Sequence, residues 1–453
     1  MKVINSAEFD LYWKDSFTRS AVSESNVEKT VSEIIAEIRF KGDEALRHYS
    51  LKFDKRCPDN FEINISEIRN AVKNLEKNDP ELSAALRFAA QNIKRFSLAQ
   101  KEQFRDFEYE NVPGVYTGQK VIPVSRAAVY VPGGRFPLMS TALMSLIPAF
   151  CAGVKEVCFV SPPSVTGEGA VIPDSRILAA AGIAAEICGR LENSSSSQSS
   201  SAQSFRIFCA GGAQAVAAFA LGTETIPRCD LIAGPGNKYV VEAKRMLFGE
   251  TGIDLLPGPS DILVICDENF DPDLAAADML AQAEHDPDAR SRALVPSREA
   301  ADLLNTAIKK RLNSSSGMET AKASLDNGGL IVIYSTVDEA VSIANNIAPE
   351  HLEIHASHPD AFTPLLKNYG SLFIGKLAAE VLGDYSSGIN HTLPTKCGSR
   401  FSGGLSVRHF LKTLTTLRCE STDGYREVLQ SAETIGKAEG LFFHAESAKI
   451  RQY

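Results

Sequence analysis

Side chains with spacings suited to chemistry first appear in the stretch DMLAQAEHDPDA, in the C-terminal half of the chain. Asp271 and Pro272 are suited to start a helix and Pro287 to end it, so we expect a helix from Pro272 to about His285. Gln282 and His285 would share one face of its last turn and could bind one metal ion together. On spacing alone we favour a polar helix end at which His285 complements the helix dipole, because Gln is a rare zinc ligand.

The segment IAPEHLEIH places Glu350 and His351 side by side, where a helix is expected to give way to a strand. Catalytic groups usually lie at strand ends. There an imidazole can exchange a proton near neutral pH, and a carboxylate can activate water. A surface ion pair is an equally good interpretation of these two residues. His355 and His358 follow at alternating or loop positions, and we expect both to be exposed.

The segment GDYSSGINHTLPT brings Asp384, Asn390 and His391 into a glycine-rich loop. Asp384 could be a third ligand for a hard or borderline cation, although Asp after Gly and the Ser-Ser-Gly run also make ordinary turns. Ser260, in LLPGPSDIL, lacks the GxSxG context of a serine nucleophile. We therefore expect Ser260 to contact a polar substrate or to cap a helix.

Near the C-terminus, KAEGLFFHAE holds Glu439 and His444, which are five residues apart with Gly440 between them. Residues at this spacing do not share a helical face, and Gly440 indicates a helix break. We therefore expect Glu439 and His444 to point into different surfaces or different subunits.

An α/β fold is expected to position these residues. The β-prone runs RAAVYV, FRIFCA and CDLIA are each followed by a glycine turn and a helical pattern, which predicts a parallel sheet covered by helices. A second series of short strands, ILVIC, RALVP, LIVIY and SLFIG, starts near residue 261, and Thr336 and Glu339 make a capping box within it. No GxGxxG is present, so the residues alone give little support for a bound dinucleotide.

The chain is expected to divide into four parts. These are an N-terminal extension (1–25), a first α/β domain with the metal and catalytic motifs (26–125 and 261–391), a second α/β domain (126–260) and a C-terminal arm (392–453). The serine-rich segment 193–204 cannot bury apolar surface, so it predicts a mobile loop that the fold tolerates as an insertion.

The composition and charge of the chain argue against several classes of function. The chain has 453 residues, of which 44% are hydrophobic and 23% charged, as in an ordinary globular protein. A net charge of −9 without a basic stripe gives a nucleic-acid function little support. The charged N-terminus lacks the apolar core of a signal peptide, and the most apolar stretch, 140–154, is too short to cross a bilayer. With nine scattered cysteines and no CxxC, we expect a cytoplasmic protein.

Eight segments together resemble the motifs of the histidinol dehydrogenases, in that family's order. They are VYVPGG, GGAQAVAA, GPGNKYV, PGPSDILV, DMLAQAEHDPDA, IAPEHLEI, GDYSSGINHTLPT and AEGLFFHA. The resemblance spans nearly the whole chain, and only the serine-rich insertion departs from the family pattern, away from every motif. It implies two Rossmann-like domains, helical terminal extensions and an intertwined homodimer with shared active sites.

The resemblance also implies roles for individual residues. The implied catalytic pair is Glu350 and His351. The implied NAD contacts are Tyr130, Gln214 and Asn237. One zinc ion per subunit is implied, with the ligands Gln282, His285, Asp384 and, from the partner subunit, His444. The implied substrate contacts are Ser260, Gln282, His285, His351, Asp384, Glu439 and His444, and His391 matches a motif position beside the site.

Enzymes of this family oxidise L-histidinol through L-histidinaldehyde to L-histidine with two NAD and one water, the last step of histidine biosynthesis. The resemblance therefore implies that His351 is a general base and acid, that Glu350 activates water, and that zinc orients the substrate, whose imidazole and amine are good ligands. The alternatives are a zinc hydrolase in which Glu350 activates metal-bound water, a binding protein without turnover, and a family member with another substrate.

Overall fold

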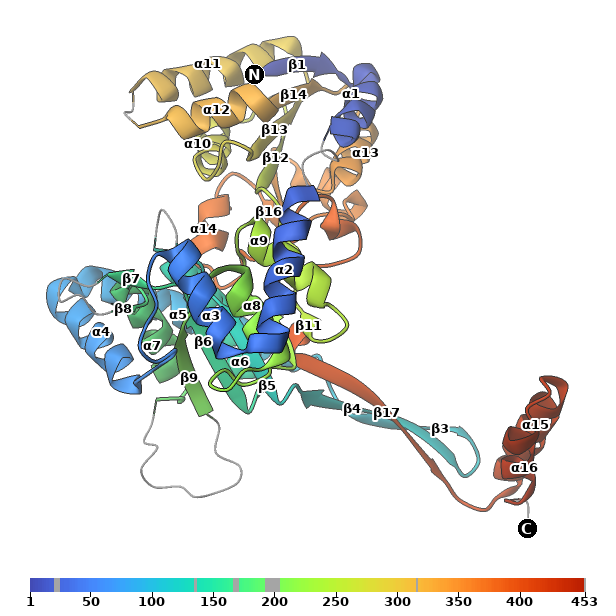
Figure 1. Ribbon diagram of the computed structural model, residues 1–453. Helices are drawn as coiled ribbons and strands as arrows, with labels where there is room; N and C mark the ends of the chain where they lie inside the picture. Colours follow the sequence, from blue (N-terminus) through green and yellow to red (C-terminus); the bar gives the residue numbers. More distant parts are fainter. Residues whose placement is uncertain (20–24, 134–136, 166–170, 192–203, 315–316, 452–453) are drawn as a thin grey trace.

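The computed structural model describes the chain except residues 20–24, 134–136, 166–170, 192–203, 315–316 and 452–453. The serine-rich segment expected to form a loop therefore lies outside the described residues, apart from Ser204. The described residues form two parallel sheets and an antiparallel ribbon, each sheet being the centre of its own core (Figure 1).

The first sheet has six parallel strands. Their order is β1 (Lys2–Asn5), β14 (Leu330–Ile333), β13 (Arg290–Val295), β12 (Asp261–Cys266), β15 (His351–His355) and β16 (Ser371–Ile374). Both faces are covered, as is usual for parallel sheets. One face packs on α1 (Ser6–Arg19) and α13 (Val337–Ile347). The other packs on α10 (Pro272–Ala283), α11 (Arg298–Ser314) and α12 (Glu319–Gly328).

The second sheet is built in the same way. Its order is β11 (Gly252–Ile253), β10 (Leu231–Ala233), β5 (Arg126–Tyr130), β6 (Glu156–Ser161), β9 (Ser204–Cys209) and β2 (Glu62–Ile63), with only β2 antiparallel to its neighbour. One face packs on α4 (Ile65–Asn78), α5 (Pro80–Lys101), α6 (Met139–Ala152) and α7 (Ser175–Ile187). The other packs on α2 (Ser25–Lys41), α3 (Asp43–Tyr49), α8 (Gly212–Leu221) and α9 (Lys238–Leu247).

The N-terminal third packs differently from the expected grouping. Helices α2 to α5 contact the sheet formed by residues 126–260, whereas we grouped 26–125 with 261–391. The segment expected as a separate extension adds β1 to the first sheet through parallel pairing with β14. The physical reason is that helical periodicity marks an apolar face, such as Ile34 and Ile38 of α2, without indicating which sheet will cover it.

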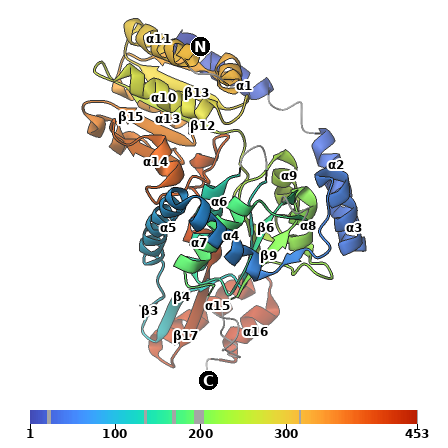
Figure 2. The same cartoon turned by 90° about the vertical axis from the view of Figure 1, so that its left-hand side faces the viewer.

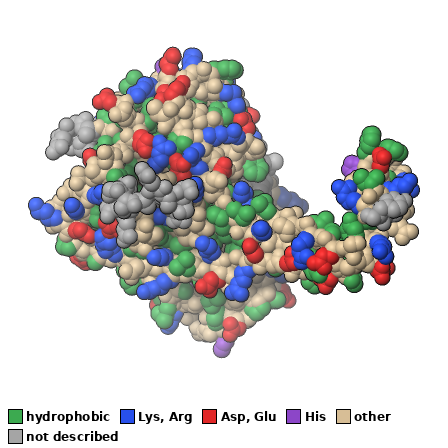
Figure 3. Space-filling view, turned by 90° about the horizontal axis from the view of Figure 1, so that it is seen from below, with side chains coloured by type: hydrophobic (Ala, Val, Ile, Leu, Met, Phe, Trp, Pro, Cys, Tyr) green, Lys and Arg blue, Asp and Glu red, His purple; other side chains and the backbone are tan. Residues whose placement is uncertain are grey.

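A projecting arm leaves the second sheet. Its ribbon consists of β3 (Phe107–Val112), β4 (Val115–Pro123) and β17 (Leu411–Cys419), and it ends in α15 (Asp423–Ala438) and α16 (Phe442–Lys449). Figures 1 and 3 show these two helices standing away from the body of the molecule. Large apolar side chains on the arm are exposed, including Leu417 (69%), Phe442 (68%) and Phe443 (79%). Exposed apolar patches of this kind usually mark an interaction surface.

The two sheet domains meet at α14 (Glu380–Tyr385) and the loop after it, in the middle of the body (Figure 2). Asn390 Nδ2 donates to the Met144 carbonyl of α6 at 2.6 Å, and His391 Nε2 lies 3.2 Å from Thr141 Oγ1. Asn92 of α5, a helix that packs on the same sheet as α6, donates to the Ser386 carbonyl at 2.8 Å. Since α14 itself contacts α10 of the first domain, it is positioned by both domains.

Candidate active site

His351 lies at the amino end of β15, opposite Ile262 at the amino end of β12. The imidazole is enclosed by protein, with 3% of the residue exposed. Its Nδ1 lies 3.4 Å from the Asp261 carbonyl oxygen and 3.8 Å from Glu350 Oε2. Since Glu350 is also buried, the interpretation of this pair as a surface ion pair is wrong.

Reciprocal hydrogen bonds with Asp261 hold Glu350 in place. The Glu350 amide donates to Asp261 Oδ1 at 2.6 Å, and the Asp261 amide donates to Glu350 Oε2 at 3.0 Å. Asp261 is in turn paired with the buried Arg292 at 3.2 Å. Asp261 was not among the expected site residues, because as the first residue of a strand it carried no spacing signal toward Glu350.

Helix α14, which lies at the boundary between the two domains, brings two carboxylates close to His351. Glu380 Oε1 lies 3.8 Å from His351 Nδ1, and Asp384 Oδ1 lies 3.5 Å from His351 Nε2. One ligand atom from each of these three residues lies within 4.8 Å of the others. Asp384 was expected from the sequence and Glu380 was not, although their spacing of four residues on one helix was a usable signal.

The charges in this cluster strongly perturb each other. Burial alone would lower the pKa of His351, but the neighbouring carboxylates of Glu350, Glu380 and Asp384 raise it to about 10. Burial raises the pKa of Glu350 to about 8 and that of Glu380 well above its ordinary value. Burial also acts to raise the pKa of Asp384, but contact with His351 lowers it overall. Three carboxyl groups thus surround a single imidazole, and burial favours the neutral forms of Glu350 and Glu380 in the absence of a further cation.

Gln282 belongs to the same cluster. The side-chain amide of Gln282 is oriented so that both of its polar atoms have a partner. In this orientation the amide nitrogen donates to Glu380 Oε1, and the amide oxygen accepts from the Asp261 backbone amide at 3.2 Å. His285 follows just beyond the end of α10, is exposed, and acts electrostatically on Asp384 and His391. The helix that we expected over 272–285 is thus confirmed to within two residues, and its end faces α14.

The cluster fits a divalent cation by its own chemistry. His351 Nε2, Glu380 Oε2 and Asp384 Oδ1 are buried and make no hydrogen bond to any described part of the chain. Buried polar atoms are rarely left unpaired, and the carboxylate oxygen of Asp384 with the imidazole of the nearby His285 is a donor combination that zinc and neighbouring transition metals accept. A cation here would also favour the ionised forms of the neighbouring carboxyl groups.

A second group of expected residues lies at the carboxyl ends of the second sheet's strands. Tyr130 ends β5, and its hydroxyl accepts from the Gly212 amide at 3.1 Å, at the start of α8. Gln214 is buried in the same turn, where its amide donates to Asp54 Oδ2 at 3.3 Å. Asn237 caps α9, accepting from the Tyr239 amide at 3.0 Å. Crevices at this edge of an open parallel sheet commonly bind nucleotides.

A buried ion pair shapes the loop that carries Asn237. Lys244 and Asp254 are fully buried and paired, and both bind the backbone of Gly234, through its carbonyl at 3.0 Å and its amide at 2.7 Å. Gly234 has φ +111° and lies against the Tyr130 backbone, where a Cβ would clash. The GPG turn thus draws the strand ends of β5 and β10 together.

The remaining expected residues are spread more widely. Ser260 is half-buried and directly precedes Asp261, so it lies beside the His351 cluster. Glu439 and His444 are exposed on α15 and α16 of the arm, and the helix break at Gly440 (φ +75°) is confirmed. Within one chain, the end of the arm lies far from α14 (Figure 1).

One expectation about histidines is wrong. His358 is exposed as expected, but His355 is only 3% exposed. The reason is that His351, Glu353 and His355 alternate along β15 and share the face that meets α10. An isolated strand pattern does not reveal that this face is covered.

Comparisons with known proteins agree over most of the chain. A family model described as histidinol dehydrogenase matches residues 17–452. A histidinol dehydrogenase of Aquifex aeolicus is 40% identical over 436 residues, covering 96% of this chain and 94% of the relative. One of Oceanobacillus iheyensis is 38% identical over 433 residues. The crystal structure of a histidinol dehydrogenase from Elizabethkingia anophelis superposes with a TM-score of 0.83 at 31% identity, covering 94% of this chain and 92% of that one.

Proposed function

This chain belongs to the histidinol dehydrogenase family of oxidoreductases, and on that premise we propose that it oxidises L-histidinol through L-histidinaldehyde to L-histidine in two NAD-dependent steps. The observation that supports the proposed chemistry best is the buried cluster of His351, Glu350 and Asp384. It brings together an imidazole, two carboxyl groups, and buried nitrogen and oxygen atoms that make no hydrogen bond. The family membership suggests the substrate.

We infer that zinc would be held by Gln282, His285 and Asp384, with His444 of the partner subunit. When bound, zinc would orient the imidazole and amine of the substrate and raise the local positive charge. Glu380 lies close enough to His351 and Asp384 to balance that charge. Ser260, adjacent to the cluster, and Glu439 of the partner subunit complete the proposed substrate contacts.

NAD, the proposed hydride acceptor, would be held by Tyr130, Gln214 and Asn237. His391 lies between the domains that carry the two proposed sites: its Nε2 lies 3.2 Å from Thr141 Oγ1 of α6, and its Nδ1 lies 3.0 Å from the Asp384 carbonyl oxygen. His391 is therefore assigned a positioning role between them.

Proton transfer is assigned to His351 and Glu350. A cation bound beside Asp384 would lower the pKa values of His351 and Glu350, so that the neutral His351 imidazole could accept the hydroxyl proton as the alcohol loses its first hydride. Glu350 would accept a proton from the water that adds to the aldehyde, while His351 returns its proton to the carbonyl oxygen, giving a hydrate and a neutral imidazole. His351 would then accept the hydrate's hydroxyl proton as the second hydride leaves. An enclosed site protects the aldehyde between the steps.

The proposal is tested by following NADH with L-histidinol before and after chelation. We expect two NADH per substrate. Chelation should reduce turnover to background while the circular dichroism spectrum persists, because both α/β cores pack without a structural metal, and added zinc should restore activity. Purified active protein without a divalent metal would contradict the ligand assignment. A zinc hydrolase or a binding protein would form no NADH, and a family member with another substrate would leave L-histidinol unoxidised.

We propose that the arm joins two chains into an intertwined homodimer. The exposed apolar side chains of the ribbon and of α16 support this, because they would be covered by a second copy, and the arm could carry Glu439 and His444 to that copy's site. The expected solution mass is that of two chains; a mass near 49.0 kDa, that of one chain, would contradict the assignment.

The proposed location is the cytoplasm. All nine cysteines are free thiols, as is typical of proteins in reducing compartments. Among the described residues, no helix combines the length and apolar character needed to span a membrane.

A further inference from the structure

A buried polar row on β15 extends beyond the proposed active site. His351, Glu353 and His355 point to the same face of the strand, and none is more than 3% exposed. The opposite face carries Leu352 and Ile354, which are ordinary core residues. Burying charged groups is costly unless they are paired. The proposed reaction uses only His351, so the other two residues need a separate explanation.

Glu353 binds the helix that carries Asp384. Its Oε1 accepts from the Glu380 amide at 2.7 Å, at the first residue of α14. The residue at the N-cap position, Ala379, has no side-chain acceptor, so Glu353 satisfies an amide that a capping side chain would otherwise satisfy. This contact sets the start of α14 against β15, one turn before Asp384.

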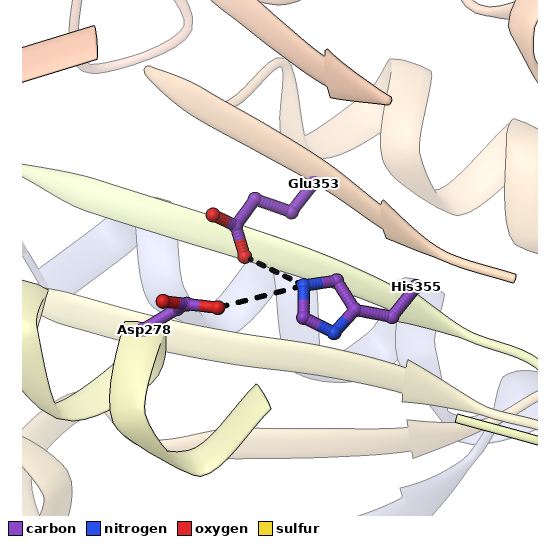
Figure 4. Close-up of side chains that lie close together, drawn as sticks. All are labelled: Asp278, Glu353 and His355. Carbon is purple, nitrogen blue, oxygen red and sulfur yellow. Dashed lines mark ion pairs between the residues drawn. The ribbon is translucent and has the colours of Figure 1, made fainter. Parts of the chain in front are cut away.

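The other carboxylate oxygen of Glu353 contacts His355, which in turn lies close to Asp278 of α10. His355 Nε2 lies 3.2 Å from Glu353 Oε2 and 3.5 Å from Asp278 Oδ2, so the ring nitrogen points between the two carboxylates (Figure 4). Although burial alone lowers the pKa of His355, Glu353 and Asp278 raise it overall, which favours an imidazolium linking them. Asp278 precedes Gln282 by one turn of α10, on the same face.

We propose that Asp278, His355 and Glu353 are positioning residues that hold Gln282 and Asp384 at the correct separation from His351. The three side chains join the three elements that carry those groups, namely α10, α14 and β15. This inference rests on the proposed function, because it concerns the same zinc site. Residues behind metal ligands typically affect metal affinity strongly. Removing one partner of a buried ion pair also costs stability, so zinc affinity and unfolding have to be measured separately.

The test measures zinc affinity by competition with a chromophoric chelator, together with thermal unfolding of the metal-free protein. Glu353→Met, which removes the acceptor for the Glu380 amide, is expected to weaken zinc binding by about 10–100-fold. Glu353→Gln should recover most of the affinity, because an amide oxygen can still accept that hydrogen bond. Asp278→Asn, at the outer end of the row, should have a smaller effect.

Tyr334→Phe is the matched control. It removes one buried hydrogen bond in the same domain, from the Tyr334 hydroxyl to the Cys266 carbonyl at 2.9 Å, and the Tyr334 side chain packs in the core on the opposite face of the sheet from the row. It should lower the unfolding temperature without changing zinc affinity. If Glu353→Met behaves like this control, the row is merely structural and the proposal fails.

Two further outcomes are decisive. Two zinc ions per wild-type chain, reduced to one by His355→Gln, would identify the row as a metal site itself and overturn the positioning role. Wild-type protein that binds no zinc and forms no NADH from L-histidinol would instead reject the proposed function, and the inference with it. An active, zinc-binding wild type with unaffected Glu353 variants rejects the inference alone.

Discussion

Replacing His351 by Asn is expected to slow both NADH-forming steps, each by about 10²–10⁴-fold, the range typical of a lost general base or acid. Both steps are affected because each hydride loss is coupled to removal of a hydroxyl proton, first from the alcohol and then from the hydrate. Asn retains a polar group near the Asp261 carbonyl oxygen, which lies 3.4 Å from His351 Nδ1, so the local packing should persist.

Stopped-flow measurement of NADH at 340 nm separates the two steps, and zinc content checks that the site remains assembled. His358→Asn is the matched control, because it makes the same substitution at an exposed position seven residues later. It should leave both phases unchanged. If the His351→Asn protein retains normal rates in both phases, another group handles the protons.

Replacing Glu350 by Gln is expected to preserve the first oxidation and to slow the second by about 10²–10⁴-fold. The first step needs no water, whereas the second needs a carboxylate that accepts a proton from water. Gln can still accept the 3.0 Å hydrogen bond from the Asp261 amide, and its own backbone amide can still donate to Asp261 Oδ1. The substitution should therefore change the chemistry more than the fold.

A burst of one NADH per site, followed by a slow phase, is the expected trace. Glu268→Gln provides the same change of charge at an exposed position beyond the carboxyl end of β12, and it should have no effect. Equal loss in both phases of the Glu350→Gln protein would reject a separate role in activating water and would indicate that Glu350 supports His351 instead.

Local patterns predicted the elements well. Half of the capping box expected at Thr336 is observed: the Thr336 hydroxyl accepts from the Glu339 amide at 3.2 Å, whereas Glu339 Oε2 accepts from the amide of Ser335, one residue before Thr336. Asp271 caps α10 as expected, and the glycine turns after β5, β9 and β10 lead into the expected helices. These features could be predicted because each depends on residues within one or two turns of each other, where backbone geometry and hydrogen bonding are decided locally.

Burial and partners could not be predicted in the same way. Residues 26–125 were grouped with 261–391, although their helices pack on the sheet of residues 126–260, and His355 was expected in solvent although its strand face meets α10. Glu380 remained unnoticed because its importance depends on the approach of α14 to β15. Such contacts join residues tens to hundreds of positions apart.

The amino-acid order alone determined the α/β class, the caps and turns, and the motifs through which the family could be identified. Tertiary structure decided that His351 is enclosed, that Glu380 and Asp261 join its cluster, and that Glu353 and His355 connect this cluster to α10. The reason is physical: backbone preference acts between neighbours along the chain, whereas burial, charge pairing and pKa depend on which surfaces come together in space.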